Sequence, residues 1–140
     1  PGLGKKEDAV ERIVLCSGKI SSELTERLNK AEDDKDWLHV LRLEQIYPFP
    51  RRVIAEIFAR YKNLKEIVWL QEEPENMGAW NYVEDGLREL AAEGATVDFM
   101  GRTRRSSPLE GDPTVHRQEQ ERILQDALTK NEIANDVVTR

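Results

Sequence analysis

The sequence predicts an α/β fold: a three-layer α/β/α sandwich around a mainly parallel four-stranded sheet with the strand order 2-1-3-4. Short apolar runs alternate with stretches of helical periodicity along the chain. The connections between these runs are too long for hairpins, so the strands run parallel and helices cover both faces of the sheet. Right-handed crossovers favour the order 2-1-3-4, which places the first and third strands side by side.

Two strand and helix pairs fill the first half of the chain. Residues 12–16 form an apolar run that ends at a Ser-Gly pair, and apolar residues then recur at helical spacing over 20–31. Residues 38–43 predict the second strand. Neither Pro48 nor Pro50 can continue inside a sheet, whereas Pro50 suits the first turn of a helix. The apolar face of this second helix consists of Val53, Ile54, Ile57, Phe58 and Tyr61.

The second half repeats the pattern. Residues 66–71 include the most apolar run of the chain and predict a strand buried on both faces, and a helix follows over 80–91. Residues 96–100 alternate between apolar and polar types, which is typical of an edge strand. The pair Asp112-Pro113 begins the last helix. The inward positions of that helix are Val115, Ile123, Leu124, Ala127 and Leu128.

The length of 140 residues allows one domain, which we assign to residues 12–129. The chain begins at Pro1 without a methionine, and residues 1–11 are interpreted as a linker from missing upstream domains. Residues 130–140 are predicted to form a polar tail.

Composition excludes several classes of function. The net charge of −6 gives an acidic surface that lacks the broad basic face needed by duplex nucleic acid. No apolar stretch approaches the roughly 18 to 20 residues that cross a bilayer, and no signal pattern is present, so no membrane partner and a cytoplasmic location are predicted. A single cysteine, Cys16, cannot form an internal disulfide, and with two histidines the chain has no zinc constellation.

The most informative motif is Gln-Glu-Glu-Pro-Glu-Asn-Met-Gly-Ala-Trp at residues 71–80, directly behind the apolar run 67–70. In parallel sheets ligands and partners meet the carboxyl ends of strands, where helices begin. With the first and third strands adjacent, residues 17–19 are expected to face residues 71–76. The alternative is that the three glutamates of this motif are solvated surface charges. Adjacent carboxylates after a strand usually point apart, which disfavours acid and base catalysis by Glu72 and Glu73.

A second constellation of arginines and serines lies at residues 101–108, behind the fourth strand. Arginine forks of this density suit a phosphate or carboxylate, and His116 lies in the first turn of the last helix, where an anion is also favoured. The alternative is that these arginines pair with the surplus of Asp and Glu in the same chain. The candidate anion-binding residues are Arg51, Arg102, Arg104, Arg105 and His116.

Nucleotide and nucleophile motifs are missing. The segment Ser17-Gly18-Lys19 lacks the first glycine of a phosphate loop, and Ile20 stands where that loop has a Ser or Thr. No G-x-G-x-x-G follows any strand and no G-x-S-x-G elbow is present. These absences disfavour nucleotide hydrolysis, dinucleotide binding and serine catalysis.

Four ordered stretches, at residues 12–19, 42–50, 71–80 and 101–108, together resemble one family. This is the C-terminal domain of the thiamine diphosphate-dependent 2-oxoglutarate dehydrogenases, and the resemblance runs from about Arg12 to Leu128. It implies a fold of the transketolase C-terminal type. The family's fold usually has a further antiparallel edge strand before the first strand found here, so an exposed sheet edge is expected.

The resemblance also implies that the catalytic groups of the enzyme lie in other domains. Thiamine diphosphate and magnesium in that family lie in the preceding domains, so no catalytic, cofactor or metal residue is expected in this chain. The intact enzyme decarboxylates 2-oxoglutarate and passes a succinyl group to the lipoyl arm of the dihydrolipoyl succinyltransferase component. The implied partners are the upstream domains, a second subunit in a homodimer, and an effector such as acetyl-CoA or AMP. The candidate domain-interface residues are Glu72, Glu73, Asn76 and Trp80.

Two other functions remain open from the sequence. A free-standing anion-binding or CoA-binding regulatory module would use the arginines behind the fourth strand. An independent enzyme would use Glu72 and Glu73, and it would turn over substrate without any other domain.

Overall fold

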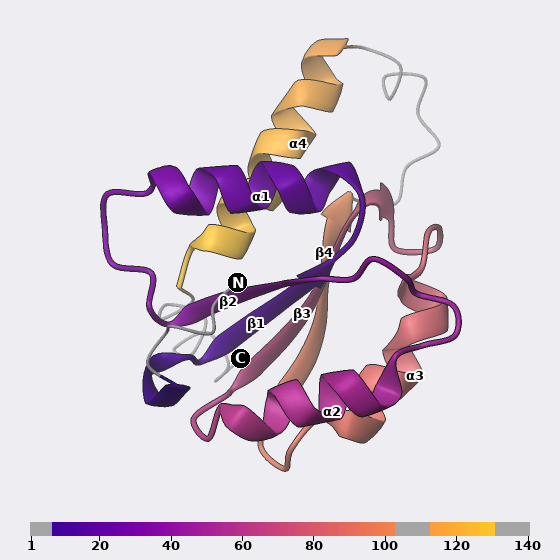
Figure 1. Cartoon of the computed structure of the whole chain (residues 1–140). Coiled ribbons are helices and arrows are strands. Elements are labelled where there is room, and N and C mark those ends of the chain that lie inside the picture. Colours follow the sequence, from indigo (N-terminus) through magenta and orange to yellow (C-terminus); the bar gives the residue numbers. More distant parts are fainter. Residues whose placement is uncertain (1–6, 103–112, 131–140) are drawn as a thin grey trace, which may run out of the picture.

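The computed structural model describes residues 7–102 and 113–130, and it confirms the predicted fold class (Figure 1). The sheet has four strands in the order β2-β1-β3-β4, and every neighbouring pair is parallel. The elements in chain order are η1 (Glu7–Ala9), β1 (Arg12–Cys16), α1 (Lys19–Lys30), β2 (Leu38–Arg42), α2 (Arg51–Arg60), β3 (Glu66–Pro74), α3 (Trp80–Leu90), β4 (Thr96–Arg102) and α4 (Pro113–Leu128).

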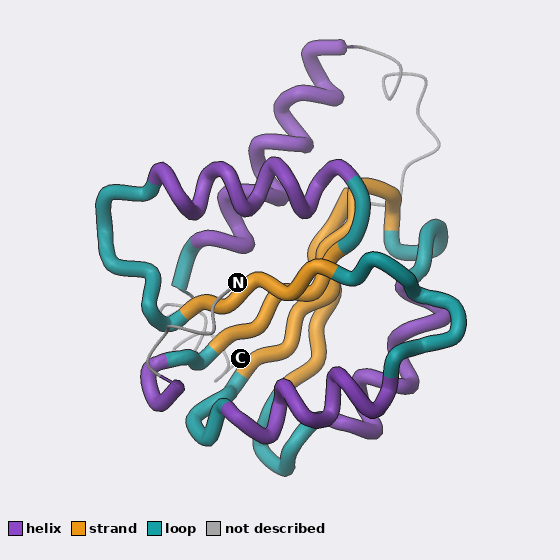
Figure 2. The backbone as a smooth tube through the Cα atoms, viewed as in Figure 1, coloured by secondary structure: helices purple, strands orange, loops and turns teal. Residues whose placement is uncertain are grey.

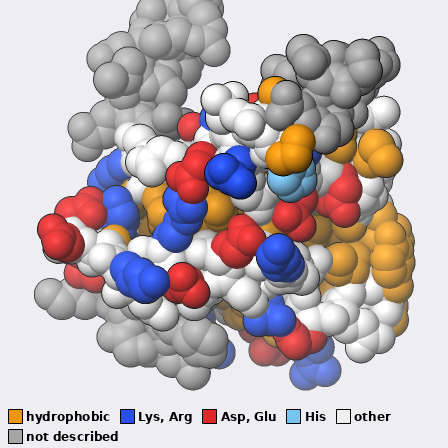
Figure 3. Space-filling view, turned by 90° about the horizontal axis from the view of Figure 1, so that it is seen from above, with side chains coloured by type: hydrophobic (Ala, Val, Ile, Leu, Met, Phe, Trp, Pro, Cys, Tyr) orange, Lys and Arg blue, Asp and Glu red, His pale blue; other side chains and the backbone are white. Residues whose placement is uncertain are grey.

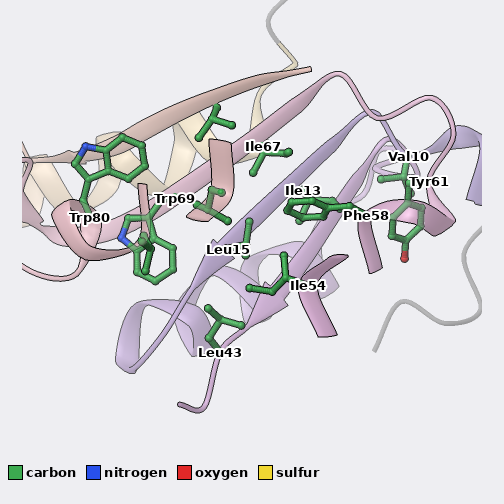
Figure 4. Packing of buried hydrophobic residues seen from close by; sticks show 13 residues of the cluster. Val10, Ile13, Leu15, Leu43, Ile54, Phe58, Tyr61, Ile67, Trp69 and Trp80 are labelled. Atoms are coloured by element: carbon green, nitrogen blue, oxygen red, sulfur yellow. The ribbon is translucent and has the colours of Figure 1, made fainter. Parts of the chain in front are cut away.

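Helices α1 and α4 cover one face of the sheet, and α2 and α3 cover the other (Figure 1). Side chains alternate along each strand, so Ile13 and Leu15 pack toward α2 and α3 while Val14 and Cys16 pack toward α1 and α4. Figure 4 shows the first of these clusters, in which Leu15 lies between the strand and helix residues that surround it. Burial on both faces explains why β1 and β3 are continuous apolar runs.

Strand β3 is longer than the sequence predicts and ends at Pro74 instead of Gln71. Its pairing with β4 is irregular: Leu70 pairs with Met100 and Pro74 pairs with Arg102, so residues 71–73 oppose Gly101 alone. A Cβ atom at Gly101 would lie 2.9 Å from the Gln71 carbonyl oxygen. The absence of a side chain at Gly101 therefore lets the two strands approach closely at this bulge.

One buried side chain precedes the predicted start of the domain at residue 12. Val10 lies inside the expected linker, yet its side chain is fully buried in the cluster under α2 and α3. Asp112, the predicted cap of the last helix, lies outside the described residues, and α4 is described from Pro113. Within α4, Val115 is half-buried, whereas the other four predicted inward residues are buried.

A buried arginine joins the last helix to the sheet. The Arg12 side chain is 0% exposed, and its guanidinium donates to both carboxylate oxygens of Glu66, at 3.1 and 3.3 Å. The same guanidinium donates to the carbonyl oxygens of Asp126, Ala127 and Thr129 at the end of α4, at 2.9 to 3.2 Å. Arg12 therefore satisfies carbonyl groups that a helix C-terminus leaves without partners.

Across the part of the chain that the structure describes, every helix is too short or too polar to traverse a bilayer.

Candidate functional site

The loops that follow β1, β2 and β3 gather at the carboxyl ends of the strands (Figure 2). There, a hollow of about 240 Å³ lies between the loop after β1 and the start of the 71–80 motif. Its lining includes Ser17, Gly18 and Lys19 on one side and Gln71, Glu72 and Glu73 on the other. The sequence prediction that these two segments face each other is therefore confirmed.

One buried side chain, the amide of Gln71, organises the motif at 71–80. Its Oε1 accepts from the indole Nε1–H of Trp69 at 2.8 Å and from the backbone N–H of Trp80 at 3.1 Å. Its Nε2 donates to the carbonyl oxygens of Glu73, Pro74 and Met77, at 3.2, 2.8 and 2.6 Å. A buried amide with partners on both its oxygen and its nitrogen holds the turn between β3 and α3 in one conformation.

Gly78 completes this turn. Its φ of 70° lies in the left-handed region, and a Cβ atom there would lie 3.0 Å from the Gln71 side chain. Glycine therefore serves both the backbone conformation and the close approach of the amide.

The turn presents polar side chains and one methionine to solvent. Glu73, Glu75, Asn76 and Met77 are exposed. Within residues 7–102 and 113–130, the structure gives no hydrogen bond or ion pair to the side chains of Glu73, Glu75 or Asn76. Within the described part of the chain, these three side chains therefore add no polar contact that stabilises the turn.

Trp80, the fourth candidate interface residue, lies inside the domain. Its side chain is 3% exposed and packs against Phe99, with 5.6 Å between ring centroids. The ring therefore supports the turn from within, and the outward surface belongs to Glu73 and its exposed neighbours.

Glu72 points toward α4 instead of solvent and joins a polar junction between four elements. The Nε2 of Gln120, on α4, donates to Glu72 at 3.0 Å and to Glu23, on α1, at 2.8 Å. Arg102, at the end of β4, lies 3.4 Å from the Oε1 of Gln120. The junction thus ties α4 to α1, β3 and β4 at the carboxyl end of the sheet.

Of the five candidate anion-binding residues, the structure brings Arg102 and His116 together. The Arg102 guanidinium lies 2.8 Å from the Nδ1 of His116. Arg51 lies apart, on α2 across the sheet, where it pairs with Glu89 of α3. Arg104 and Arg105 lie outside the described residues.

The thiol of Cys16, the single cysteine of the chain, is expected to be unreactive at neutral pH. Burial raises the pKa of Cys16 from 9.0 to about 12, and the nearby Arg42 guanidinium offsets part of that rise. The thiol therefore stays protonated at neutral pH and is a weak nucleophile. Among the described residues, no three His, Cys, Asp or Glu side chains converge in a way that could hold a metal ion.

A larger hollow of about 720 Å³ lies along β2, between α1 and α2. Its floor includes Val40, Leu41, Ile57 and Tyr61, and β2 is one of the two edge strands. Among the described residues this hollow therefore lies beside an edge of the sheet.

Sequence reasoning missed the two amides that organise the site, Gln71 and Gln120. A local signal exists for Gln71, because an amide at the end of a strand that is buried on both faces must find partners inside the protein. No such signal exists for Gln120, whose partners lie 97 and 48 residues away in the chain.

Comparison with known proteins gives the family. Residues 2–128 match the family model described as 2-oxoglutarate dehydrogenase C-terminal. The chain is 57% identical over 129 residues to the 2-oxoglutarate dehydrogenase E1 component of Bacillus subtilis (strain 168), and 58% identical over 131 residues to that of Geobacillus sp. (strain WCH70). These matches cover 92% and 94% of this chain but 14% of each relative. A match to the E1 component of Exiguobacterium sp. (strain ATCC BAA-1283 / AT1b) is 48% identical over 139 residues and covers 99% of this chain and 15% of that relative. The chain therefore spans about one seventh of the length of these relatives, and it belongs to the 2-oxoglutarate dehydrogenase C-terminal family.

Proposed function

We propose that this chain serves as the structural C-terminal domain of a 2-oxoglutarate dehydrogenase E1 component and docks on the upstream domains through the turn at residues 72–79. The observation that carries the proposal is the buried amide of Gln71, which fixes this turn while Glu73, Glu75 and Asn76 remain exposed. A turn held in one conformation loses little entropy on binding, so its polar groups are suited to a permanent contact.

The proposed parent reaction is the decarboxylation of 2-oxoglutarate with transfer of a succinyl group to the lipoyl arm of the dihydrolipoyl succinyltransferase component. Thiamine diphosphate and magnesium are assigned to the upstream domains, and the parent is proposed to act as a cytoplasmic homodimer. No bond-breaking step is assigned to this chain. The proposal predicts that the 140-residue chain alone does not turn over 2-oxoglutarate.

The docking role is tested in the full-length enzyme with the double variant Glu73→Ala/Asn76→Ala. Both side chains are exposed, so the variant leaves the core of this domain intact. We expect a fall in the thermal midpoint and in turnover, because polar contacts with the upstream domains are lost. The matched control is Glu93→Ala, an exposed glutamate after α3 near the opposite end of the strands.

Unchanged dimerisation, stability and turnover in the double variant would remove the docking role. Trp80→Ala is a poorer test on its own, because Trp80 is a core residue of this domain. Its effect would combine lost packing with lost docking.

A regulatory role is the second part of the proposal, with an anionic effector such as acetyl-CoA or AMP meeting Arg102 and His116. The observation in its favour is that these two residues converge from β4 and α4. Calorimetry on the full-length enzyme tests it directly. Arg102→Ala should weaken binding, whereas Arg51→Ala should not, because Arg51 lies across the sheet in a pair with Glu89.

No heat with either effector at millimolar concentration would remove the regulatory role. Binding of equal strength by the isolated chain would instead favour a free-standing regulatory module. Titrating both the full-length enzyme and the isolated chain therefore distinguishes a regulatory site of the intact enzyme from a free-standing module.

A further inference from the structure

Four large hydrophobic side chains stand out on the surface of the described residues: Tyr47, Val53, Met77 and Tyr82, with exposed fractions of 58%, 56%, 56% and 44%. We refer to them together as the Tyr47 patch. They come from the connection before α2, the start of α2, the turn at 72–79 and the start of α3. In Figure 3 hydrophobic side chains gather along the right-hand side, the side on which the β2–α2 loop lies in Figure 1.

The aromatic part of the patch is held rigidly. The rings of Tyr47 and Tyr82 lie 4.2 Å apart between centroids, and the Tyr82 hydroxyl accepts from the backbone N–H of Phe49 at 3.3 Å. The side chain of Gln45 donates to the Tyr47 carbonyl oxygen at 2.8 Å. These contacts fasten the β2–α2 loop to α3.

Phe49 also holds the β2–α2 loop against α3. A Cβ atom at Gly86, in the middle of α3, would lie 2.6 Å from the Phe49 ring. The absence of a side chain at Gly86 therefore leaves room for the Phe49 ring on the surface of α3. Met77 is fixed separately, because its carbonyl oxygen accepts from the Gln71 amide. The hydrophobic side chains are therefore presented on a scaffold that is already ordered before any partner binds.

Exposed hydrophobic side chains on an ordered scaffold mark an interaction surface, and the rings of Tyr47 and Tyr82 are in direct contact here. Four such side chains expose an apolar area on the order of 400 Å², about half of what one partner of a standard interface buries. That area is too small for a stable contact between free molecules, but a covalent connection raises the effective concentration of the partner surface to the millimolar range. The size of the patch thus favours a contact within one polypeptide.

We propose that the Tyr47 patch packs against the upstream region of the same polypeptide, with the carboxylates of Glu73 and Glu75 on its rim. The complementary surface is apolar at its centre and basic at its edge, because the exposed Glu73 and Glu75 belong to the same turn as Met77. The matched relatives are about seven times as long as this chain, and the chain matches a C-terminal family, so such an upstream region exists in them. This inference rests on the proposed function and adds the hydrophobic centre of the contact.

Hydroxyl-radical footprinting of the full-length enzyme tests the proposal. Tyr61 is the internal reference, because it is 4% exposed in this domain. We expect Tyr47 to lose its labelling down to the level of Tyr61, and Met77 to be protected as well. Labelling of Tyr47 and Met77 at the rate of freely exposed side chains would overturn the proposal.

Two further measurements assign the partner. Protection that does not change on dilution supports a contact within one polypeptide, whereas protection that is lost on dilution assigns the patch to a second copy and overturns the proposal. The variant Met77→Asp should raise the labelling of Tyr47, because a carboxylate in an apolar contact is destabilising. The control Lys62→Asp, at an exposed position after α2, should leave that labelling unchanged.

Turnover of 2-oxoglutarate by the same enzyme sample distinguishes a failure of this inference from a failure of the proposed function. An active enzyme with a fully labelled patch would contradict this inference and leave the proposed function standing. A full-length protein without that activity would contradict the proposed function itself.

Discussion

Gln71 is the residue on which the candidate site depends most. It lies at the bulge where β3 and β4 lose their regular register, and its amide replaces the hydrogen bonds that the sheet no longer supplies there. It also accepts from the first backbone N–H of α3, a position that would otherwise lack a partner. One buried side chain thus contacts the bulge in β3, the turn that follows it and the first residue of α3.

Replacing this amide should loosen the turn without emptying the space it fills. In Gln71→Met the indole N–H of Trp69 and the carbonyl oxygens of the turn lose their buried partner. We expect the free energy of unfolding to fall by about 2 to 4 kcal/mol. Chemical denaturation measures this loss, and Gln118→Met, at an exposed position of α4, is the matched control.

A Gln71→Met variant as stable as the parent chain would contradict the role given to this amide. Faster exchange of the amide protons between Glu72 and Ala79 is the corresponding local signature.

Cys16 gives a second prediction at the residue scale. Because burial raises its pKa to about 12, the folded state keeps the proton at a pH where the unfolded state, with a pKa near 9.0, has lost it. The contribution of the protonated thiol is fully present below pH 9 and is lost as the pH rises toward 12. The free energy of unfolding should fall by about 1.4 kcal/mol per pH unit in that window from this group alone.

The comparison with Cys16→Ala isolates this effect, because other groups titrate in both proteins. The difference in stability between the two should be constant below pH 9 and should shrink above it. A difference that is constant throughout would contradict the predicted shift. At neutral pH the native thiol should also react slowly with a disulfide reagent and quickly after unfolding.

At the scale of elements, the sequence predicts the strands and their order well, because that information is local. The apolar runs at β1 and β3 and the prolines before α2 are visible without any tertiary contact. The extension of β3 to Pro74 could not be predicted, since it depends on Gly101 and on a bulge between distant segments.

Some features of the candidate site could likewise be predicted from local sequence, whereas others depend on contacts between distant segments. The facing of residues 17–19 and 71–73 could be predicted, because it follows from strand order. Arg51 on α2 pairs with Glu89 of α3, whereas Arg102 of β4 meets His116 of α4 on the other face of the sheet, and charge alone does not reveal this separation. The burial of Trp80 depends on contact with Phe99, a residue on another element.

Helix α4 illustrates how an element is held by one residue of another. Its buried side chains lie in its second half, and its C-terminal carbonyl groups are bound by Arg12 of β1. In Arg12→Met we expect a loss of about 3 to 5 kcal/mol, because Glu66 loses its buried partner and the helix end loses its donors. Chemical denaturation measures the total loss in the free energy of unfolding. Faster hydrogen exchange in α4 would show that the loss is located at this helix.

The control is Arg27→Met, which removes the exposed pair between α1 and Glu121 of α4. Solvent screens an exposed ion pair so that it contributes little to stability, and this variant should remain near the stability of the parent. Equal effects of the two substitutions would contradict the anchoring role of Arg12.

At the scale of the whole molecule, polar and apolar groups share one end of the sheet. The turn at 72–79 carries exposed carboxylates, and it also carries Met77 of the Tyr47 patch, whose other members lie before α2 and at the starts of α2 and α3. A contact that combines both should depend partly on ionic strength, since salt screens exposed charges but leaves apolar burial intact. The proposed docking therefore has a measurable salt signature.

This signature can be tested by adding the 140-residue chain to an E1 component that lacks the corresponding region. We expect the chain to restore stability or turnover, and we expect its apparent affinity to fall as salt rises from about 0.05 to 0.5 M, because the Debye length shortens across that range. In Glu73→Gln/Glu75→Gln the salt dependence should weaken, whereas Glu93→Gln should retain it. A salt dependence that is the same in all three chains would show that these carboxylates do not face the upstream domains, and docking would then have to rest on the Tyr47 patch alone.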